Sequence, residues 1–316
     1  MEEKKKIAIK LKNQLGTVSD CLMNFDGVSL YPSAMSDKDS EYPRAETARV
    51  FDISEEKDFL AQFNSQTFRP KTAVLKIMYE NPNTVFLQHL PSKDKEKFYN
   101  PETKANETKT LNRFRNGKVI DTLCSVDIQE IVRMGGKILK IYSGIVYEKN
   151  YDFSPFQNYI TNLFEMRKVF KKENNEAGSE LVKTLLNSLY GKTVQRDITF
   201  TTHLWNLQTL KTEYDDTIKS YEKICDDLYY VEKNKDTQEY VDEEEESPIT
   251  SLCPAQLGIF ILAHSRRIMN NFITSIEGSK TPEIYYGDTD SLYIHKKHWD
   301  TLNKNGHVGN NKSRKK

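Results

Sequence analysis

The sequence predicts an α+β fold, in which antiparallel strands and packed helices come from separate stretches of the chain. Short runs rich in β-branched and aromatic residues flank Gly287-Asp288-Thr289-Asp290, so a β-hairpin is expected over residues 284–294. Near the N-terminus a strand is expected to end at Asp26, and Pro32 prevents its regular continuation. Helices are predicted at residues 155–172, 179–190 and 254–276, the last beginning at Pro254.

The predicted helix over residues 179–190 has two distinct faces, which lie on opposite sides at about 3.6 residues per turn. The polar stripe holds Lys183, Asn187 and Tyr190. The apolar stripe holds Leu181, Leu185 and Leu189. We expect the leucines to pack and the polar stripe to face outward, with Gly191 suited to the helix end. An ordinary solvated face is the simpler alternative to a functional stripe.

The preceding helix carries cations spaced one turn apart, of which Arg167 with Lys171 is the favoured pair. A link near residues 173–176 brings this helix back toward Lys183. Cations that converge from two helices suit a triphosphate, whose oxygens accept charge-assisted hydrogen bonds. A solvated face is again the alternative.

The stretch between the N-terminal strand and the helix pair mixes several signals. Residues 37–70 are polar and rich in turn signals, without a strong helix signal, and residues 93–118 are expected to form a charged, looped insertion. Strands are predicted at residues 73–79, 84–87, 118–120 and 138–147, and a helix at 127–134 that ends at Gly135-Gly136.

Asp288 and Asp290 place two carboxylates at the tip of the predicted hairpin. Such a concentration of negative charge calls for a balancing cation, and oxygen ligands favour Mg²⁺ or Mn²⁺ over Zn²⁺. The alternative is structural, because Asp also populates turns through local hydrogen bonds.

Three segments, in this order, resemble the motifs of the family B (alpha-like) DNA polymerases. Asp26–Ser33 resembles the first palm motif D-x-x-S-L-Y-P-S, Lys183–Gly191 the fingers motif K-x-x-x-N-S-x-Y-G, and Tyr286–Ser291 the second palm motif Y-G-D-T-D-S. The resemblance extends from about residue 20 to about residue 297. The wide separations between the motifs are similar to those of the protein-primed branch, whose members carry two insertions.

The resemblance implies a right-hand polymerase architecture, with a palm made of an antiparallel sheet and packed helices and with a helical-hairpin fingers subdomain. The expected parts are an N-terminal palm segment (1–36), a first α+β insertion (37–154), the fingers (155–192), a second, acidic insertion (193–250), a palm helix and hairpin (251–300) and a basic disordered tail (301–316). Only 25 residues precede Asp26 and few follow the hairpin, so we expect the exonuclease domain and most of the thumb to be absent. A fragment, a subunit of a split enzyme and a remnant of a selfish element's gene are the open interpretations.

The resemblance also implies two-metal-ion nucleotidyl transfer, with Asp26, Asp288 and Asp290 as the catalytic residues. Asp26 and Asp290 are the expected ligands of two Mg²⁺ ions about 4 Å apart, for which Mn²⁺ could substitute. Asp288 has an orienting role, and the backbone carbonyl of Val28 is a further expected metal ligand.

The expected deoxynucleotide-binding residues come from the same motifs. Backbone groups of Ser29 and Leu30 would contact the triphosphate, and Tyr31 resembles the steric gate that excludes a ribose 2′-OH. Lys183 would pair with the phosphates, together with Arg167 and Lys171. Asn187 and Tyr190 would border the nascent base pair.

The expected function is therefore a template-directed DNA polymerase module that adds deoxynucleotides to a primer 3′ or protein hydroxyl, without a proofreading exonuclease. Its expected partners are template-primer DNA, deoxynucleoside triphosphates and, as a further candidate, a terminal protein primer. The alternative is a catalytically weak remnant that binds DNA or terminal protein. A reverse transcriptase is disfavoured, because Thr289 separates Asp288 from Asp290, whereas those enzymes have two adjacent aspartates.

The formal net charge is zero, but the charge is unevenly distributed. Residues 71–150 hold 14 Lys and Arg against 9 Asp and Glu, and this basic stretch is suited to phosphates. Residues 211–246 hold 5 against 14, and we expect this acidic segment to be a solvated loop that points away from DNA, with contact to a basic protein as the alternative.

The cysteines Cys21, Cys124, Cys225 and Cys253 lie far apart, which excludes a C-x-x-C zinc site and disfavours a disulfide framework. No stretch has the length of a membrane-spanning helix, and no signal-peptide core follows the charged N-terminus. We therefore expect an intracellular, reducing compartment and no membrane partner.

Overall fold

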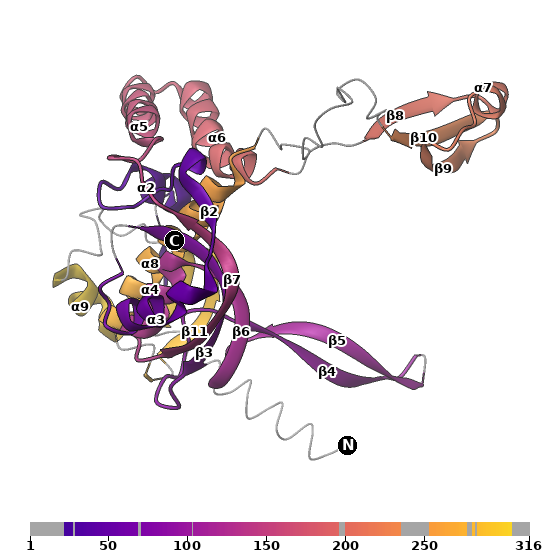
Figure 1. Ribbon diagram of the computed structural model, residues 1–316. Helices are drawn as coiled ribbons and strands as arrows, with labels where there is room; N and C mark the ends of the chain where they lie inside the picture. Colours follow the sequence, from indigo (N-terminus) through magenta and orange to yellow (C-terminus); the bar gives the residue numbers. More distant parts are fainter. Residues whose placement is uncertain are drawn as a thin grey trace, which may run out of the picture. The chain divides into compact units, whose positions relative to one another are not determined.

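Figure 1 shows the computed structural model, which describes residues 22–304 apart from 28, 69–70, 103, 196–199, 235–252, 277–279 and 282. The chain forms two compact units. The larger combines Met1–Tyr190 with Gln256–Lys316, and the smaller comprises Gly191–Ala255. Within the described part of the chain, no helix has the length and apolar character needed to span a membrane.

The predicted N-terminal strand and acidic hairpin form one antiparallel sheet in the larger unit, in the order β1-β12-β11. Its strands are β1 (Leu22–Asp26), β11 (Ile284–Asp288) and β12 (Ser291–His295). Phe25, Leu292 and Ile294 of this sheet share a core cluster with Met269 and Phe272 of the long helix α8 (Ala255–Ser275). The predicted strand, hairpin and long helix are confirmed, and α8 supports the sheet that carries the acidic residues.

The strand ends at Asp26 as expected, and the segment that follows it forms a helix that was not expected from the sequence. This helix is α2 (Leu30–Ser36), with Pro32 in the first turn. The missing N–H of proline costs nothing there, because the first N–H groups of a helix have no intrahelical partner. A proline that forbids a regular strand is thus compatible with the start of a helix.

Helices α5 (Gln157–Lys172) and α6 (Glu176–Thr193) form the predicted helix pair and lie side by side in Figure 1. The predicted leucine face of α6 is wrong. Leu181 and Leu185 are 62% and 40% exposed, whereas Val182 and Leu186 are buried, at 2% and 0%. Val182, Leu186 and Leu189 also follow helical spacing, so the sequence held two overlapping apolar stripes. Packing against α2, α5 and α8 in a common core selected the second stripe.

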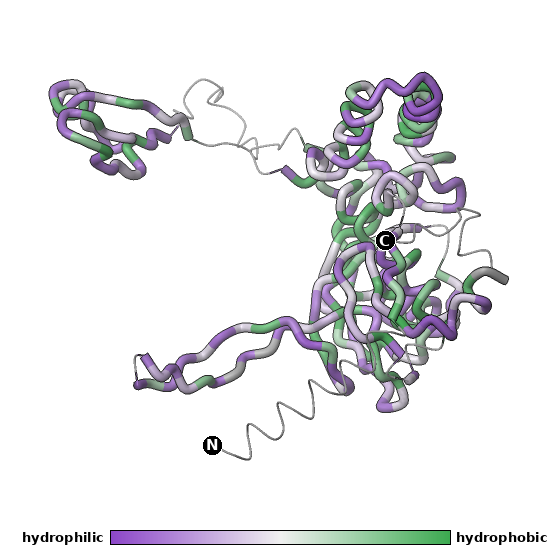
Figure 2. Tube along the Cα trace, turned by 180° about the vertical axis from the view of Figure 1, so that it is seen from behind, coloured by the Kyte–Doolittle hydropathy of each residue, from purple (hydrophilic) through white to green (hydrophobic). Residues whose placement is uncertain are grey.

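A second sheet of the larger unit has four antiparallel strands in the order β2-β7-β3-β6. The strands are β2 (Ala48–Val50), β3 (Thr72–Asn81), β6 (Gly117–Cys124) and β7 (Lys137–Tyr147). Leu75, Ile77 and Tyr79 alternate with more exposed residues along β3 and pack against helices α3 (Glu56–Asn64) and α4 (Ser125–Arg133). Figure 2 shows apolar colouring through the body of the larger unit, which contains this core.

Helix α4 ends as predicted at Gly135-Gly136. The N–H of Gly135 donates to Val132 and that of Gly136 to Ile131, both at 2.9 Å, and Gly135 has φ of 92°. This is the Schellman pattern of paired end bonds, which needs a left-handed residue at the position of Gly135.

Three predictions about the stretch before the helix pair are wrong. Helix α3 lies within residues 37–70, where no helix was expected. Residues 84–87 contain no strand, and residues 93–118 are not a loop. Strands β4 (Ser92–Asn100) and β5 (Ala105–Arg113) pair there into a long two-stranded ribbon. Their exposed polar residues hide the alternation by which a strand with one buried face is recognised.

The smaller unit contains a three-stranded antiparallel sheet in the order β8-β10-β9. Its elements are β8 (Phe200–Trp205), α7 (Leu207–Thr212), β9 (Ile218–Cys225) and β10 (Leu228–Asn234), and Val231 and Leu210 are buried. The acidic segment 211–246, which was expected to be a loop, instead contributes β9 and β10, and its run 242–246 lies outside the described residues. Of the predicted disordered tail 301–316, residues 301–304 are helical, whereas 305–316 lie outside the described residues, as does Cys21. The described residues also form the short helices η1 (Ala45–Thr47), η2 (Ile53–Glu55), η4 (Lys296–His298) and α9 (Trp299–Lys304).

Candidate active site

The end of β1 lies against the tip of the β11–β12 hairpin. Antiparallel pairing sets Asp26 opposite Ser291, and Ser291 is also opposite Asp288 across the hairpin. The N–H of Gly27 donates to the carbonyl oxygen of Asp290 at 2.6 Å. A Cβ at residue 27 would lie 3.2 Å from that oxygen, so glycine permits this close approach. Two acidic segments from opposite ends of the chain are therefore joined at the backbone.

The hairpin tip is a two-residue turn, Thr289-Asp290, between paired Asp288 and Ser291. Thr289 has φ of 47°, a left-handed conformation that tight hairpin turns usually give to Gly, Asn or Asp. A β-branched residue is strained in this conformation, and such strain is typical of functional sites. The turn holds Asp288 and Asp290 on either side of Thr289.

The Asp26 and Asp290 carboxylates influence each other. Partial burial raises the pKa of Asp26, and the negative charge of Asp290 raises it further. This repulsion is the condition that a cation relieves. Mg²⁺ typically binds one or two protein carboxylates and completes its shell with waters or substrate phosphates. The oxygen donors present therefore fit Mg²⁺, and Mn²⁺ by the same chemistry.

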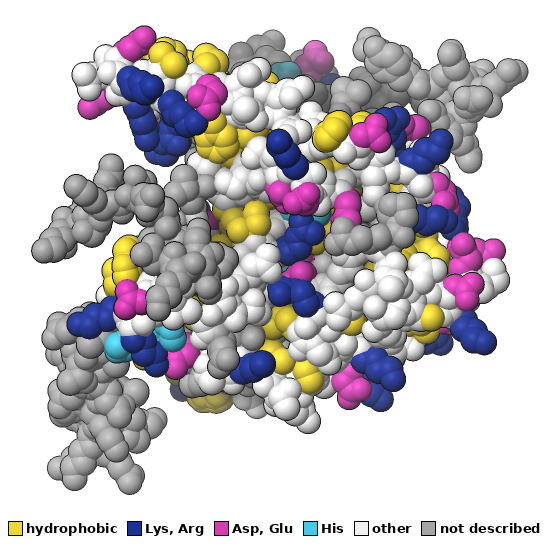
Figure 3. Space-filling view, turned by 90° about the vertical axis from the view of Figure 1, so that its left-hand side faces the viewer, with side chains coloured by type: hydrophobic (Ala, Val, Ile, Leu, Met, Phe, Trp, Pro, Cys, Tyr) yellow, Lys and Arg dark blue, Asp and Glu magenta, His cyan; other side chains and the backbone are white. Residues whose placement is uncertain are grey.

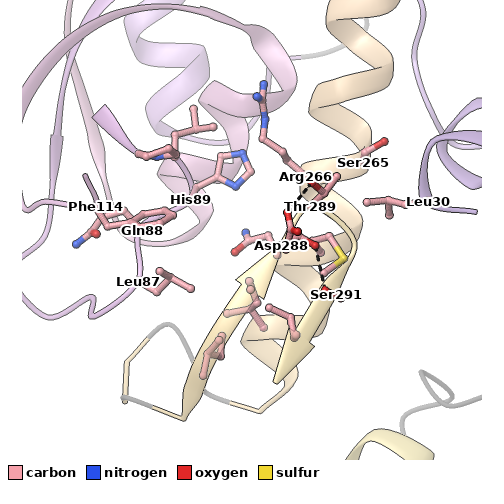
Figure 4. Close-up of a pocket in the computed structure, with 18 of the residues that line it drawn as sticks. Leu30, Leu87, Gln88, His89, Phe114, Ser265, Arg266, Asp288, Thr289 and Ser291 are labelled. Carbon is pink, nitrogen blue, oxygen red and sulfur yellow. Dashed lines mark hydrogen bonds between the residues drawn. The ribbon is translucent and has the colours of Figure 1, made fainter. Parts of the chain in front are cut away.

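The described contacts of Asp288 are all within the hairpin turn. Its side chain is exposed and accepts a hydrogen bond from the Thr289 hydroxyl at 3.1 Å, while its carbonyl accepts one from the Ser291 hydroxyl at 3.2 Å (Figure 4). No group of three or more His, Cys, Asp or Glu among the described residues is placed to hold a metal ion. The predicted backbone ligand Val28 lies outside the described residues.

Tyr31 of α2 stacks on Tyr190 of α6, with ring centroids 4.2 Å apart and planes 8° from parallel. Burial raises the pKa of Tyr31, and Tyr190 and Asp290 raise it further, whereas Arg266 lowers it. The tyrosine pair therefore lies within electrostatic reach of the hairpin and of α8. Of the predicted contacts around Tyr31, Leu30 is buried and Ser29 has φ of 52°.

A cavity of about 500 Å³ opens beside the hairpin. Its wall combines Tyr31, Arg266, Asp288 and Ser291 with apolar residues of α8 and of the segment 87–91. Figure 4 shows the Arg266 side chain directed from α8 away from Asp288 and Thr289, with its guanidinium on the side of His89. The cavity thus borders the turn that carries the acidic residues.

Arg266 belongs to a polar seam between α4 and α8 that the sequence reasoning missed. Its guanidinium donates to both carboxylate oxygens of Asp127, at 2.5 and 3.1 Å, and Nε2 of His89 contacts the same carboxylate at 2.9 Å. Burial alone would raise the pKa of Asp127, but His89 and Arg266 hold it below the ordinary value. Asp127 and His89 are buried, while Arg266 is 32% exposed.

A second contact repeats the first one turn further along both helices. The Asn270 amide donates to Glu130 at 2.6 Å in a buried position. Asp127 and Glu130 are three residues apart on α4, and Arg266 and Asn270 are four apart on α8, so each pair lies on one helix face. This matched spacing of polar residues is the sequence signal that could have found the seam.

The predicted phosphate-binding cations lie on α5 and α6, outside the cavity wall. Lys183 forms an ion pair with Glu180 at 2.9 Å, and Asn187 is exposed. Arg167 is half-buried, and its Nε has no hydrogen-bond partner among the described residues; Lys171 is exposed. Figure 3 shows Lys and Arg side chains gathered near the top of the drawn face, at the height of these helices in Figure 1. The structure thus brings Asp26 and Asp290 together and stacks Tyr31 on Tyr190, whereas Lys183 pairs with Glu180 of its own helix.

The comparison with protein families agrees with the motifs. The family described as DNA polymerase type B, organellar and viral, matches residues 8–278. The chain belongs to this family. The resemblance expected from the three motifs is confirmed, and the β11–β12 hairpin lies beyond the matched residues.

Two known proteins are similar over most of the chain. A DNA polymerase of Kluyveromyces lactis is 24% identical over 279 residues, which are 87% of this chain and 24% of that protein. The Phi29 DNA polymerase, solved with primer-template DNA and incoming nucleotides, has a TM-score of 0.50 and 17% identity over 87% of this chain and 39% of its own. The expected mixed fold with antiparallel sheets is confirmed as similar to that polymerase. The chain spans about a quarter of the K. lactis relative.

Proposed function

We propose that this chain supplies the palm and fingers of a template-directed DNA polymerase, which adds deoxynucleotides to a primer 3′ hydroxyl or to a protein hydroxyl. The observation that carries the proposal is the junction of Asp26 with Asp290 through the Gly27 hydrogen bond. Family membership supports it. The primer-template DNA and nucleotides named for the Phi29 polymerase support DNA and deoxynucleoside triphosphates as partners.

Asp26 and Asp290 would hold Mg²⁺ or Mn²⁺, with the Val28 carbonyl as a further ligand and Asp288 in an orienting role. Bound as a pair, such ions stabilise negative charge on the oxygen that attacks the α-phosphorus and on the oxygen that leaves with pyrophosphate. The hydrogen bond from Gly27 to Asp290 fixes the two segments relative to each other, so both carboxylates are positioned before substrate arrives.

The remaining residues would hold the nucleotide. Tyr31 would occupy the space of a ribose 2′-OH, and stacking on Tyr190 restrains its ring. Lys183, Arg167 and Lys171 would balance the triphosphate charge, with backbone groups of Ser29 and Leu30, and Asn187 would border the base pair.

The proposal includes an intracellular, reducing compartment and a terminal protein as a candidate primer. The compartment is supported by Cys124 and Cys225, which are free thiols.

Primer extension with Mg²⁺ tests the function, with Asp26→Asn and Asp290→Asn against the wild type. Asp58→Asn is the matched control, because Asp58 is exposed on α3 outside the site. We expect extension by the wild type and the control, and a loss of at least about 100-fold in both site variants, because even the outer-shell partners of metal ligands typically contribute about 10–100-fold.

Metal binding has a separate readout. Mg²⁺ should raise the melting temperature of the wild type and of Asp58→Asn, but not of Asp26→Asn. Folding raises the pKa of Asp26, so ionisation of this carboxyl lowers the stability of the folded protein as pH rises above the ordinary pKa of aspartate. Without metal at pH 7, Asp26→Asn should therefore be at least as stable as the wild type. If the wild type and all variants bind DNA but none extends a primer, the result would instead support the weakly catalytic remnant.

A further inference from the structure

The β4–β5 ribbon presents two chemically different faces. Residues that pair directly across an antiparallel ribbon point to the same side, and the side alternates along each strand. Lys93, Lys95 and Lys97 therefore share a face, and their partners Asn112, Thr110 and Thr108 share it too. The same row continues with Tyr99 opposite Asn106.

We call this side, formed by Lys93, Lys95, Lys97, Tyr99, Asn106, Thr108, Thr110 and Asn112, the lysine face. It contains three cations and no acidic residue. The opposite register positions of β5 hold Glu107 together with Lys109 and Arg113, so they mix both signs. Although the net charge of the chain is zero, all the charged side chains on the lysine face are therefore positive.

The lysine face is open to solvent, and all eight of its residues are exposed. On the other face, Glu107 and Leu111 are only partly exposed. Tyr99 is 64% exposed, and none of the described core clusters includes its ring. An exposed aromatic ring beside a row of lysines is the combination by which proteins hold single strands, since the ring stacks on a base while the cations follow the backbone.

We propose that the lysine face binds the phosphate backbone of a DNA strand, with an unpaired base stacked on Tyr99. Successive lysines on one strand face are about 6.6–6.8 Å apart, and a DNA strand carries one phosphate per about 3.4 Å of helix axis, so several phosphates lie within reach of the three lysines. The hydroxyl and amide groups of Thr108, Thr110 and Asn112 line the same path and donate to phosphate oxygens. The proposal rests on the proposed function in taking DNA as the strand.

The test measures binding of a fluorescent single-stranded oligodeoxynucleotide as a function of salt, which needs no catalysis and so separates this proposal from the proposed activity. The variant is Lys93→Gln with Lys95→Gln and Lys97→Gln. The matched control, Lys104→Gln with Lys109→Gln and Arg113→Gln, removes the same charge from the turn and the other face of the same ribbon.

The lysine-face variant should lower the salt-dependence slope of log K by about 2, and the affinity at 0.1 M salt on the order of 100-fold. The control should change the slope by less than about 0.5. Tyr99→Ala should weaken single-strand binding about 5-fold or more and leave duplex binding unchanged. A Lys-to-Arg version of the triple variant should restore binding, which guards against a folding defect.

Equal losses in the two triple variants would mean that only net charge matters and would overturn the proposal. So would unchanged binding in the lysine-face variant, or lysine-dependent binding of polyglutamate as tight as that of DNA, which would assign the face to an acidic protein. If wild type binds with the expected pattern but extends no primer, the proposed activity fails and this inference stands.

Discussion

The rings of Tyr31 and Tyr190 lie within 8° of parallel with their centroids 4.2 Å apart, although α2 and α6 are separated by more than a hundred residues of sequence. The stack links the segment that follows Asp26 to the helix that carries Lys183. Each ring is only half-buried, so the pair is accessible from solvent. Aromatic pairs of this kind contribute about 0.5–1.5 kcal/mol beyond their buried area.

Tyr31→Ala should increase ribonucleotide incorporation relative to deoxynucleotide incorporation by about 10-fold or more, because the ring no longer fills the space of a 2′-OH. Tyr31→Phe keeps the ring and should leave the ratio unchanged. Tyr190→Ala removes the stacking partner and should have an intermediate effect. Single-turnover kinetics with paired nucleotides give the ratio, and an unchanged ratio in Tyr31→Ala would reject the gate role.

Lys183→Ala should raise the KM for deoxynucleotides about 10-fold while costing less than about 1 kcal/mol of stability, because its ion pair with Glu180 is largely solvated. Lys168→Ala is the matched control, since Lys168 pairs with Glu165 at the same spacing on the neighbouring helix. Extension kinetics and urea unfolding separate the two effects. Equal KM values in both variants would favour the solvated-face interpretation of Lys183.

Asp127→Asn should destabilise the protein by about 3–5 kcal/mol, because it leaves Arg266 beside a neutral partner in a largely buried network. Folding lowers the pKa of Asp127 below the ordinary pKa of aspartate. The stabilisation by its ionised carboxylate is therefore complete at pH values above that ordinary pKa, and it is lost as pH falls through the pKa of the folded protein. Urea unfolding across acidic pH measures both effects.

Asp58→Asn controls for the loss of one carboxylate on an exposed helix face. Adding Arg266→Met to Asp127→Asn should recover part of the loss, since the cation is then removed as well. Stability of Asp127→Asn equal to wild type would contradict the structural role of the seam.

His264 predicts a second pH dependence. It is buried on α8, its Nε2–H donates to the Glu41 carbonyl at 2.9 Å, and burial lowers its pKa from 6.5 to about 4. The unfolded chain takes up a proton at higher pH than the folded protein, so unfolding free energy should fall by up to about 3 kcal/mol as pH drops through this window.

His264→Gln retains a donor for Glu41 and removes the titration. The difference between the wild-type and variant stability curves should therefore be confined to the range between pH 6.5 and about 4. A difference that is constant with pH would show that His264 contributes packing but no proton linkage.

Local patterns predicted the elements whose signals are strong in sequence. Asp26, the acidic hairpin and α8 were found because strand termini, turn residues and an N-terminal proline act over a few positions. Helix α3 and the β4–β5 ribbon were missed. In the ribbon both faces are largely exposed, so the sequence lacks the contrast between buried and exposed positions on which periodicity depends.

The order of residues alone was sufficient to identify the family and the acidic, cationic and aromatic side chains suited to nucleotide chemistry, because each motif is a short, contiguous set of residue types. Folding settled which of these residues meet. The pairing of β1 with β12 brings Asp26 to Asp290, the buried stripe of α6 turns Tyr190 toward Tyr31, and α8 carries Arg266 to Asp127. These contacts join residues more than a hundred positions apart, and they depend on packing between elements that no local pattern encodes.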